Sequence, residues 1–166
     1  MYGKKVLESG HEAVVARLLA PRVAADPNQA RTDDGTTPLW RAACHGYEAV
    51  VAMLLAPGIE TDPNQTDCDG CTPLCIAAAA WQLCNSQNNH EAVVALLLAP
   101  GVGTDPNQAR KIDGATPLCI AAQGDNEAIV KLLLASGADR TVRTKNGTAA
   151  EIAAKHGHVA VVELLK

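Results

Sequence analysis

Apolar positions recur along this chain in a helical pattern that returns five times. Glu-Ala-Val-Val stands at 12–15, 48–51 and 91–94, followed by Glu-Ala-Ile-Val at 127–130 and Val-Ala-Val-Val at 159–162. Each copy continues into a Leu-Leu pair, and the Val and Leu positions fall at helical spacing along one face. The pattern predicts five helices, each with a single apolar stripe.

A second motif precedes four of these segments and predicts a further helix in each of those repeats. Thr-Pro-Leu begins at 37, 72 and 116 and runs into an Ala-Ala pair, and a weaker copy without Pro begins at Thr148. A Thr hydroxyl can cap free backbone N–H groups, and Pro is tolerated in the first turn of a helix. Asp-Gly or Asn-Gly pairs at 34–35, 69–70, 113–114 and 146–147 predict a turn before each helix.

Neither kind of helix can bury its apolar stripe within one repeat. The copies are therefore expected to stack, so that each repeat covers its neighbour and stability becomes a sum of repeat and interface terms. Hydrophobic residues make up 48% of the chain but aromatic residues only 2%, with no Phe, which suits thin layers of small aliphatic side chains. The sequence predicts an all-α solenoid of stacked antiparallel helix pairs joined by β-turn or hairpin loops.

These motifs resemble the ankyrin repeat, a unit of about 33 residues with a TPLHxA helix start, two antiparallel helices and a turn. The resemblance covers nearly the whole chain and implies a single domain over residues 1–166. It implies helix pairs at 1–25, 37–57, 72–100, 116–136 and 148–166. The corresponding repeats are 1–32, 33–66, 67–110, 111–143 and 144–166.

Two features depart from the ankyrin pattern. Where the family continues Gly-Ala-Asp, as at 137–139, the three earlier linkers are longer and carry Asp-Pro-Asn, which predicts a turn. The third repeat also contains extra residues within Ala79–Asn89, and we expect its first helix to gain about two turns before a polar loop. Trp81 in this insertion is either an anchor for a partner or a residue that packs the longer helix against its neighbours.

The resemblance implies that a partner protein binds the concave surface made by the turn tips and the first helices. Carried over by position, and with Trp81 added from the insertion, the candidate contact residues are Arg31, Asp33, Asp34, Thr36, Trp40, Arg41, Cys44, His45, Asp67, Cys68, Asp69, Cys71, Ala79, Trp81, Arg110, Lys111, Ile112, Ala115 and Gln123. Each has an alternative as a solvated or turn-forming residue. Trp40 has a second alternative, which is to fill the groove between adjacent first helices.

Charge and hydropathy narrow the partner class. A net charge of −4 gives no overall attraction to nucleic acid or to anionic lipid. The longest apolar run, at 92–99, is far shorter than the roughly 20 residues of a membrane-spanning helix. We expect a monomer, in the cytoplasm or nucleus, that binds another protein and neither nucleic acid nor membrane.

The sequence offers little chemistry. Cys68 and Cys71 form a CxxC, with Cys75, Cys84 and His90 nearby as possible further zinc ligands, but the pair coincides with a turn that other repeats form without Cys. No catalytic or nucleotide-binding motif is present, and we expect neither an enzyme nor a cofactor. Two alternatives to a binding scaffold stay open: an engineered or purely structural stack without a natural partner, and a metal- or thiol-responsive switch at Cys68 and Cys71.

Overall fold

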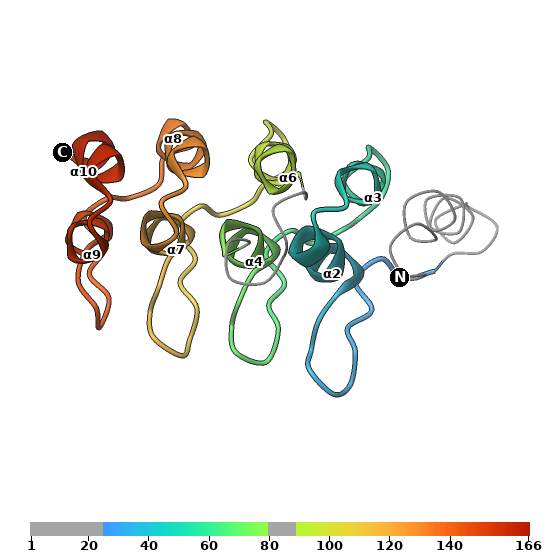
Figure 1. The fold of residues 1–166 in the computed structure, drawn as a ribbon. Coiled ribbons are helices and arrows are strands. Elements are labelled where there is room, and N and C mark those ends of the chain that lie inside the picture. The colour runs from blue at the N-terminus through green and yellow to red at the C-terminus, as the bar shows by residue number, and fades with distance from the viewer. Residues whose placement is uncertain (1–24, 80–88) are drawn as a thin grey trace, which may run out of the picture.

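The computed structural model describes residues 25–79 and 89–166, which contain eight helices and no β-strand. The helices form four consecutive pairs in two rows (Figure 1): α2 (Pro38–His45) with α3 (Glu48–Leu54), α4 (Pro73–Ala78) with α6 (His90–Leu97), α7 (Pro117–Gln123) with α8 (Glu127–Ala135), and α9 (Ala149–His156) with α10 (Val159–Leu165). The all-α stack predicted from the sequence is confirmed for this part of the chain. The helix pair expected at 1–25 lies outside the described residues, apart from residue 25.

The first helix of each pair begins at a capping threonine, as the sequence indicates. In all four, the threonine hydroxyl accepts a hydrogen bond from the backbone N–H three residues further on, at 3.1–3.4 Å. The capping residues are Thr37, Thr72, Thr116 and Thr148. Thr148 alone among these four is completed into a capping box, because only its helix has a glutamate three residues after the capping threonine: the Glu151 carboxylate accepts from the Thr148 N–H at 3.1 Å.

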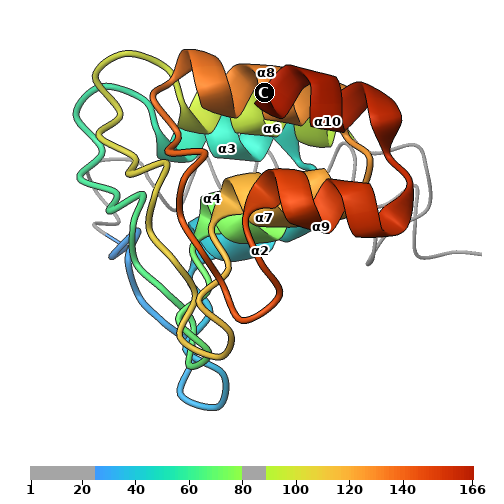
Figure 2. The same cartoon turned by 90° about the vertical axis from the view of Figure 1, so that its left-hand side faces the viewer.

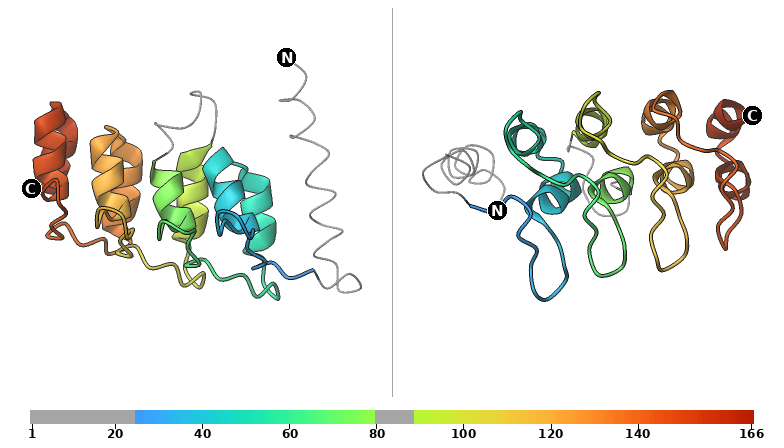
Figure 3. Two further views of the ribbon diagram at one scale, coloured as in Figure 1. Left: turned by 90° about the horizontal axis from the view of Figure 1, so that it is seen from below. Right: turned by 180° about the vertical axis from the view of Figure 1, so that it is seen from behind.

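The two rows of helices form the two layers of the stack (Figure 2). First helices α2, α4, α7 and α9 lie in one row, second helices α3, α6, α8 and α10 lie in the other, and each helix contacts its neighbours along the row (Figure 3, left). The buried core runs through the stack as one apolar cluster, in which Leu39, Leu74 and Leu118 of the first helices are at most 1% exposed. Because every interior apolar stripe is covered by the next pair, packing between repeats supplies the core that a single pair lacks.

The Asp-Pro-Asn linkers form a ladder of side chains along the stack. Asn28 donates its amide N–H to the Glu60 carbonyl at 2.7 Å and accepts from the Asp62 N–H at 2.7 Å. Asn64 makes the same two bonds to Gly103 and Asp105, both at 2.8 Å. Asn107 bridges to Gly137 and Asp139, at 3.3 and 2.7 Å. We call these three residues the asparagine ladder.

Local turns in the three linkers position the asparagine ladder. In each of the three linkers the Asp carboxylate accepts from the backbone N–H of the Asn two residues later, at 2.8–2.9 Å, which fixes the turn locally. The Asn side chain is then held facing the next linker, where it satisfies one backbone donor and one acceptor. In the shorter last linker Thr141 takes the place of the asparagine, and its hydroxyl and N–H both bind Asp139.

The prediction that the first helix of the third repeat is longer than the others is wrong, because this helix, α4, is not extended into the insertion. Helix α4 ends at Ala78 and is two residues shorter than α2, because Ala79 already leaves helical geometry at φ −84° and ψ 6°. The remainder of the insertion up to residue 88, with Trp81, lies outside the described residues. Helix α6 then begins at His90, one residue before Glu91, which is the equivalent of the first residues of α3 and α8.

Candidate functional site

Four loops project from the same side of the first helices (Figure 1). We call them fingers A (31–36), B (67–71), C (110–115) and D (143–148). Each is closed by a backbone hydrogen bond across its base, from residue 31 to 36, 67 to 71, 110 to 115 and 144 to 147, at 3.0–3.1 Å. We call the surface made by the fingers and the first helices the finger–helix face. It is the surface on which the resemblance places partner binding.

The fingers form a row in which each tip is bonded to the next. Cys68 N–H of finger B donates to the Asp34 carbonyl of finger A, and Lys111 N–H of finger C donates to the Asp69 carbonyl of finger B, both at 3.0 Å. The link between fingers C and D is different, because there the Lys145 Nζ donates to the Ile112 carbonyl at 3.1 Å. The approach is close enough at Gly70 that a Cβ there would lie 2.9 Å from the Lys111 backbone nitrogen.

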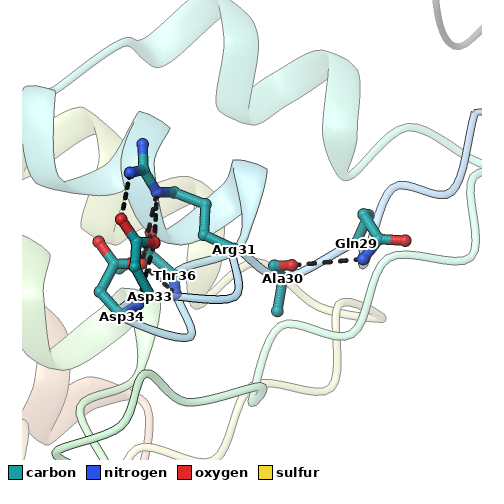
Figure 4. A network of polar contacts seen from close by, with 6 residues as sticks. All are labelled: Gln29, Ala30, Arg31, Asp33, Asp34 and Thr36. Atoms are coloured by element: carbon teal, nitrogen blue, oxygen red, sulfur yellow. Dashed lines mark hydrogen bonds and ion pairs between the residues drawn. The ribbon is translucent and has the colours of Figure 1, made fainter.

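Finger A is held by a local network of charged side chains (Figure 4). Arg31 donates two hydrogen bonds from its guanidinium to the two carboxylate oxygens of Asp33. The Asp34 carboxylate accepts from both the N–H and the hydroxyl of Thr36, at 2.9 and 2.7 Å. The hydrogen bond from Arg31 keeps the pKa of Asp33 well below its usual range, and those from Thr36 lower the pKa of Asp34. Both aspartates are therefore anionic at neutral pH.

Finger C carries the corresponding ion pair with less exposure to solvent. Arg110 binds both carboxylate oxygens of Asp113 at 2.8 and 2.7 Å, and about three quarters of each side chain is buried. This contact lowers the pKa of Asp113 despite the opposing effect of burial, and it raises that of Arg110. The pair braces the finger and leaves Lys111 and Ile112 at its exposed tip.

The structure divides the sequence-derived contact candidates by burial. The side chains that face solvent are Arg31, Asp33, Arg41, Cys68, Asp69, Lys111 and Ile112. Those that are half-buried are Asp34, Trp40, Cys44, His45, Asp67, Arg110 and Gln123. Those that are buried are Thr36, Cys71, Ala79 and Ala115. Trp81 lies outside the described residues.

The buried candidates share a structural explanation. Thr36, Cys71 and Ala115 each precede the capping threonine of a first helix, and this position turns inward in every one of these repeats, leaving 4–7% of the residue exposed. Ala79 caps the end of α4 and is 4% exposed. The structure therefore does not bring these four side chains onto the finger–helix face, and their contribution is to packing.

Trp40 packs between two repeats, which fits the alternative that it fills the groove between adjacent first helices. Its indole N–H donates to the Cys71 carbonyl at 3.1 Å, and its ring lies against the buried core. The neighbouring Arg41 is exposed, whereas Ile76 and Ile120 at the same position of the next repeats are buried. Arg41 is thus the better placed of the two for contact with a partner.

The cysteines of the CxxC do not converge. Cys68 is exposed at the tip of finger B, whereas Cys71 is buried beside Cys75. A hydrogen bond to Cys75 and burial raise the pKa of Cys71, which keeps this thiol protonated. His90 is itself buried, with its Nε2 3.1 Å from the Cys44 carbonyl. Within residues 25–79 and 89–166 no three potential metal ligands lie together, and Cys84 is outside these ranges.

Each described histidine places a ring nitrogen close to a backbone carbonyl near the end of a first helix. His45 and His156 each place Nδ1 2.8–2.9 Å from the carbonyl four residues earlier, in the last turn of a first helix. His90 and His158 each reach across to a carbonyl of the preceding repeat at 3.1 Å, that of Cys44 and that of Gln123 respectively. The Cys44 and Gln123 carbonyls are among the last four of their helices and have no intrahelical partner, so the contacts from His90 and His158 satisfy them.

A cavity of about 270 Å³ opens on the finger–helix face between α7 and α9. Its lining residues are Gln123, Asn146, Ile152, Lys155 and His156. Of these, only Gln123 is among the contact residues predicted from the sequence. Lys155 could have been predicted as well from the alignment of the repeats, because it occupies in the last repeat the position of Cys44, Ala79 and Gln123 in the earlier ones.

The sequence matches a known protein family. A family model for ankyrin repeats, in three copies, matches residues 5–101 and 81–166. The chain belongs to the ankyrin repeat family. Proteins of this family generally act as modules for protein–protein interaction and are typically non-enzymatic. No curated protein matches the chain, and among the described helices none combines the length and the apolar character needed to cross a membrane.

Proposed function

We propose that this chain is a protein-binding scaffold that holds a partner protein against its finger–helix face without any chemical step. The observation that carries the proposal is the row of bonded fingers: Cys68 to Asp34 and Lys111 to Asp69, each through the backbone at 3.0 Å. Because these links fix neighbouring tips relative to each other, the exposed side chains on them form a preformed surface. Such a surface loses little conformational entropy when it binds.

The composition of the exposed face supports a protein as the partner. Arg41, Lys111 and Ile112 are solvent-facing; arginine is enriched at protein interfaces, and the buried core of an interface is more apolar than the rest of the surface. The net charge of −4 gives no general attraction to nucleic acid. In this proposal residues 1–166 act as one monomeric domain in the cytoplasm or nucleus, where the cysteines stay reduced.

Affinity capture with matched variants tests the proposal. The finger–helix variant carries Arg41→Ala, Lys111→Ala and Ile112→Ser, and the control variant carries Glu91→Ala, Glu127→Ala and Lys131→Ala. The control residues are exposed on α6 and α8 in the row of second helices, so the two variants change opposite sides of the stack. Each bait is first compared with the original chain by urea unfolding, so that loss of fold is separated from loss of binding.

Quantitative mass spectrometry of the captured proteins gives the result. We expect at least one protein to be captured by the original chain and by the control variant and to be lost from the finger–helix variant. Equal capture by all three baits, or loss from the control variant alone, would refute binding through this face.

A further inference from the structure

The four fingers carry opposite charge in the two halves of the row. Finger A contains one arginine and two aspartates and finger B two aspartates, which gives the first two fingers a net charge of −3. Finger C contains one arginine, one lysine and one aspartate, and finger D one arginine and one lysine, which gives the last two a net charge of +3. Fingers C and D therefore attract acidic groups, although the chain as a whole is acidic.

Internal ion pairs leave the positive charge on three lysines. Arg110 is neutralised by Asp113 at 2.7 Å and Arg143 by Glu151 at 3.0 Å. In the described part of the chain, none of the ion pairs involves Lys111, Lys145 or Lys155, and all three side chains are exposed. Their ammonium groups are available to a ligand on the finger–helix face.

The cavity between α7 and α9 lies within this positive region. Ile152, 5% exposed, forms an apolar part of its lining, and Gln123, Asn146, Lys155 and His156 supply polar groups. No carboxylate lines it. Lys155 Nζ donates to the Asn146 carbonyl at 2.6 Å, which holds the ammonium group at the junction of finger D and α9 and leaves two of its three N–H donors for a ligand.

The C-terminal ends of α7 and α9 repel an anion in this cavity only weakly. A helix C-terminus carries a partial negative charge of up to about half an elementary charge. The carbonyls of Gln123 and Ile152 already lie 3.1 and 2.9 Å from the His158 and His156 ring nitrogens, which satisfies them. Lys155, in the last turn of α9, therefore brings a full positive charge to a lining that contains no carboxylate.

An apolar contact point lies beside the lysines. Ile112 at the tip of finger C is 61% exposed, and Val159 is the only other large hydrophobic side chain this open to solvent in the described ranges. Ile112 follows Lys111 in the chain, and its carbonyl accepts the 3.1 Å hydrogen bond from Lys145. An apolar side chain placed between two exposed lysines suits a ligand in which acidic and apolar residues adjoin.

From these features we infer that the partner presents an acidic, apolar-flanked segment to fingers C and D. One carboxylate of this segment enters the cavity and accepts hydrogen bonds from Lys155, a second acidic group lies near Lys111 and Lys145, and an apolar side chain covers Ile112. The inference rests on the proposed protein-binding function and specifies its partner.

Selection from a library of random 12-residue peptides displayed on phage, with the full chain as bait, tests this inference. Selected peptides are then labelled with fluorescein and titrated by fluorescence anisotropy against the chain and its variants. Lys155→Met removes the charge in the cavity and keeps an apolar stem, and Ile112→Ser removes the apolar contact. Lys131→Met on α8 is the matched control, because it removes the same charge from an exposed lysine in the row of second helices.

We expect the selected peptides to combine Asp or Glu with Leu or Ile. Lys155→Met should weaken their binding about tenfold, because a charge-assisted hydrogen bond is lost. Ile112→Ser should weaken it severalfold, and Lys131→Met should change it less than twofold.

The other outcomes separate this inference from the proposed function. Basic peptides that lose affinity on Asp69→Asn but not on Lys155→Met would overturn the inference and leave the finger–helix face as the binding surface. Acidic peptides unaffected by Lys155→Met, or no enrichment at all, would also overturn it, while the capture experiment above decides the proposed function independently. Peptides that lose affinity only on Lys131→Met would count against both.

Discussion

The asparagine ladder makes a quantitative prediction about coupling between repeats. Asn64 lies at its centre and makes two 2.8 Å hydrogen bonds to the next linker, one as donor to Gly103 and one as acceptor from Asp105. A hydrogen bond contributes about 0.5–1.5 kcal/mol net to stability. Because Asn64 is half-buried, the lower part of that range applies, and Asn64→Ala should lower the free energy of unfolding by about 1–2 kcal/mol.

Urea denaturation followed by circular dichroism at 222 nm measures the effect. With a slope of about 2 kcal/mol per molar urea, the midpoint should fall by about 0.5–1 M. The transition should also broaden, since the substitution weakens an interface term and neighbouring repeats unfold less cooperatively. Gln65→Ala is the control, because Gln65 is the adjacent residue of the same linker and contributes no bond to the ladder.

Two results would refute this reasoning. The first is an Asn64→Ala protein that matches Gln65→Ala to within about 0.5 kcal/mol, the usual range for surface substitutions. The second is strong non-additivity between Asn28→Ala and Asn107→Ala, which lie in different interfaces and share no partner. Distant sites without shared partners are expected to add within about 0.5 kcal/mol.

Substitutions at three further positions probe other contacts. Trp40→Phe removes the indole donor to the Cys71 carbonyl and should lower the free energy of unfolding by about 1–2 kcal/mol in the same urea assay. Ala121→Leu introduces a large side chain where the residue is fully buried between first helices, and overpacking should lower stability by about 1–3 kcal/mol, whereas Ala121→Gly should cost about 1 kcal/mol. Asp113 has a pKa lowered by Arg110 in the folded state, so its contribution is present above the unfolded value of 3.8 and is lost as pH falls through the folded value. Asp113→Asn should therefore lower the free energy of unfolding at pH 7 by about 1 kcal/mol and make the melting temperature fall less steeply below pH 4. If the melting temperature of the variant falls as steeply below pH 4 as that of the original chain, Asp113 does not make this contribution.

The stacked architecture could be predicted from the sequence because its causes are local and repeated. A Thr-Pro helix start, an alanine-rich helix and a Val/Leu stripe each specify one step, and their fixed order specifies the pair. Repetition then implies stacking, since a single pair cannot bury its stripe. The predicted extension of α4 was wrong because the local sequence is misleading there. Ala78, Ala79 and Ala80 all favour helix, and nothing in the composition indicates that the helix ends after Ala78.

The details of the finger–helix face depend on contacts between repeats, which a linear pattern does not contain. That Asn64 reaches the following linker depends on the spacing of the stack, and no local propensity expresses it. The inward orientation of Cys71 and Ala115 depends likewise on the neighbouring repeat. Lys155 was identifiable in principle, since it aligns with Gln123 across the last two repeats, but its cavity exists only because α7 and α9 lie side by side.

The main-chain links between the first three finger tips have a consequence for how this surface can evolve. The bonds from Cys68 to Asp34 and from Lys111 to Asp69 use only backbone atoms, so they survive replacement of any of those four side chains other than by proline at a donor position. Gly35 and Gly70 are constrained exceptions, because an added Cβ would lie 3.1 Å from the Cys68 nitrogen and 2.9 Å from the Lys111 nitrogen, respectively. Mutation can therefore exchange the chemical character of the tips, and with it the choice of ligand, while the spacing of the fingers stays the same.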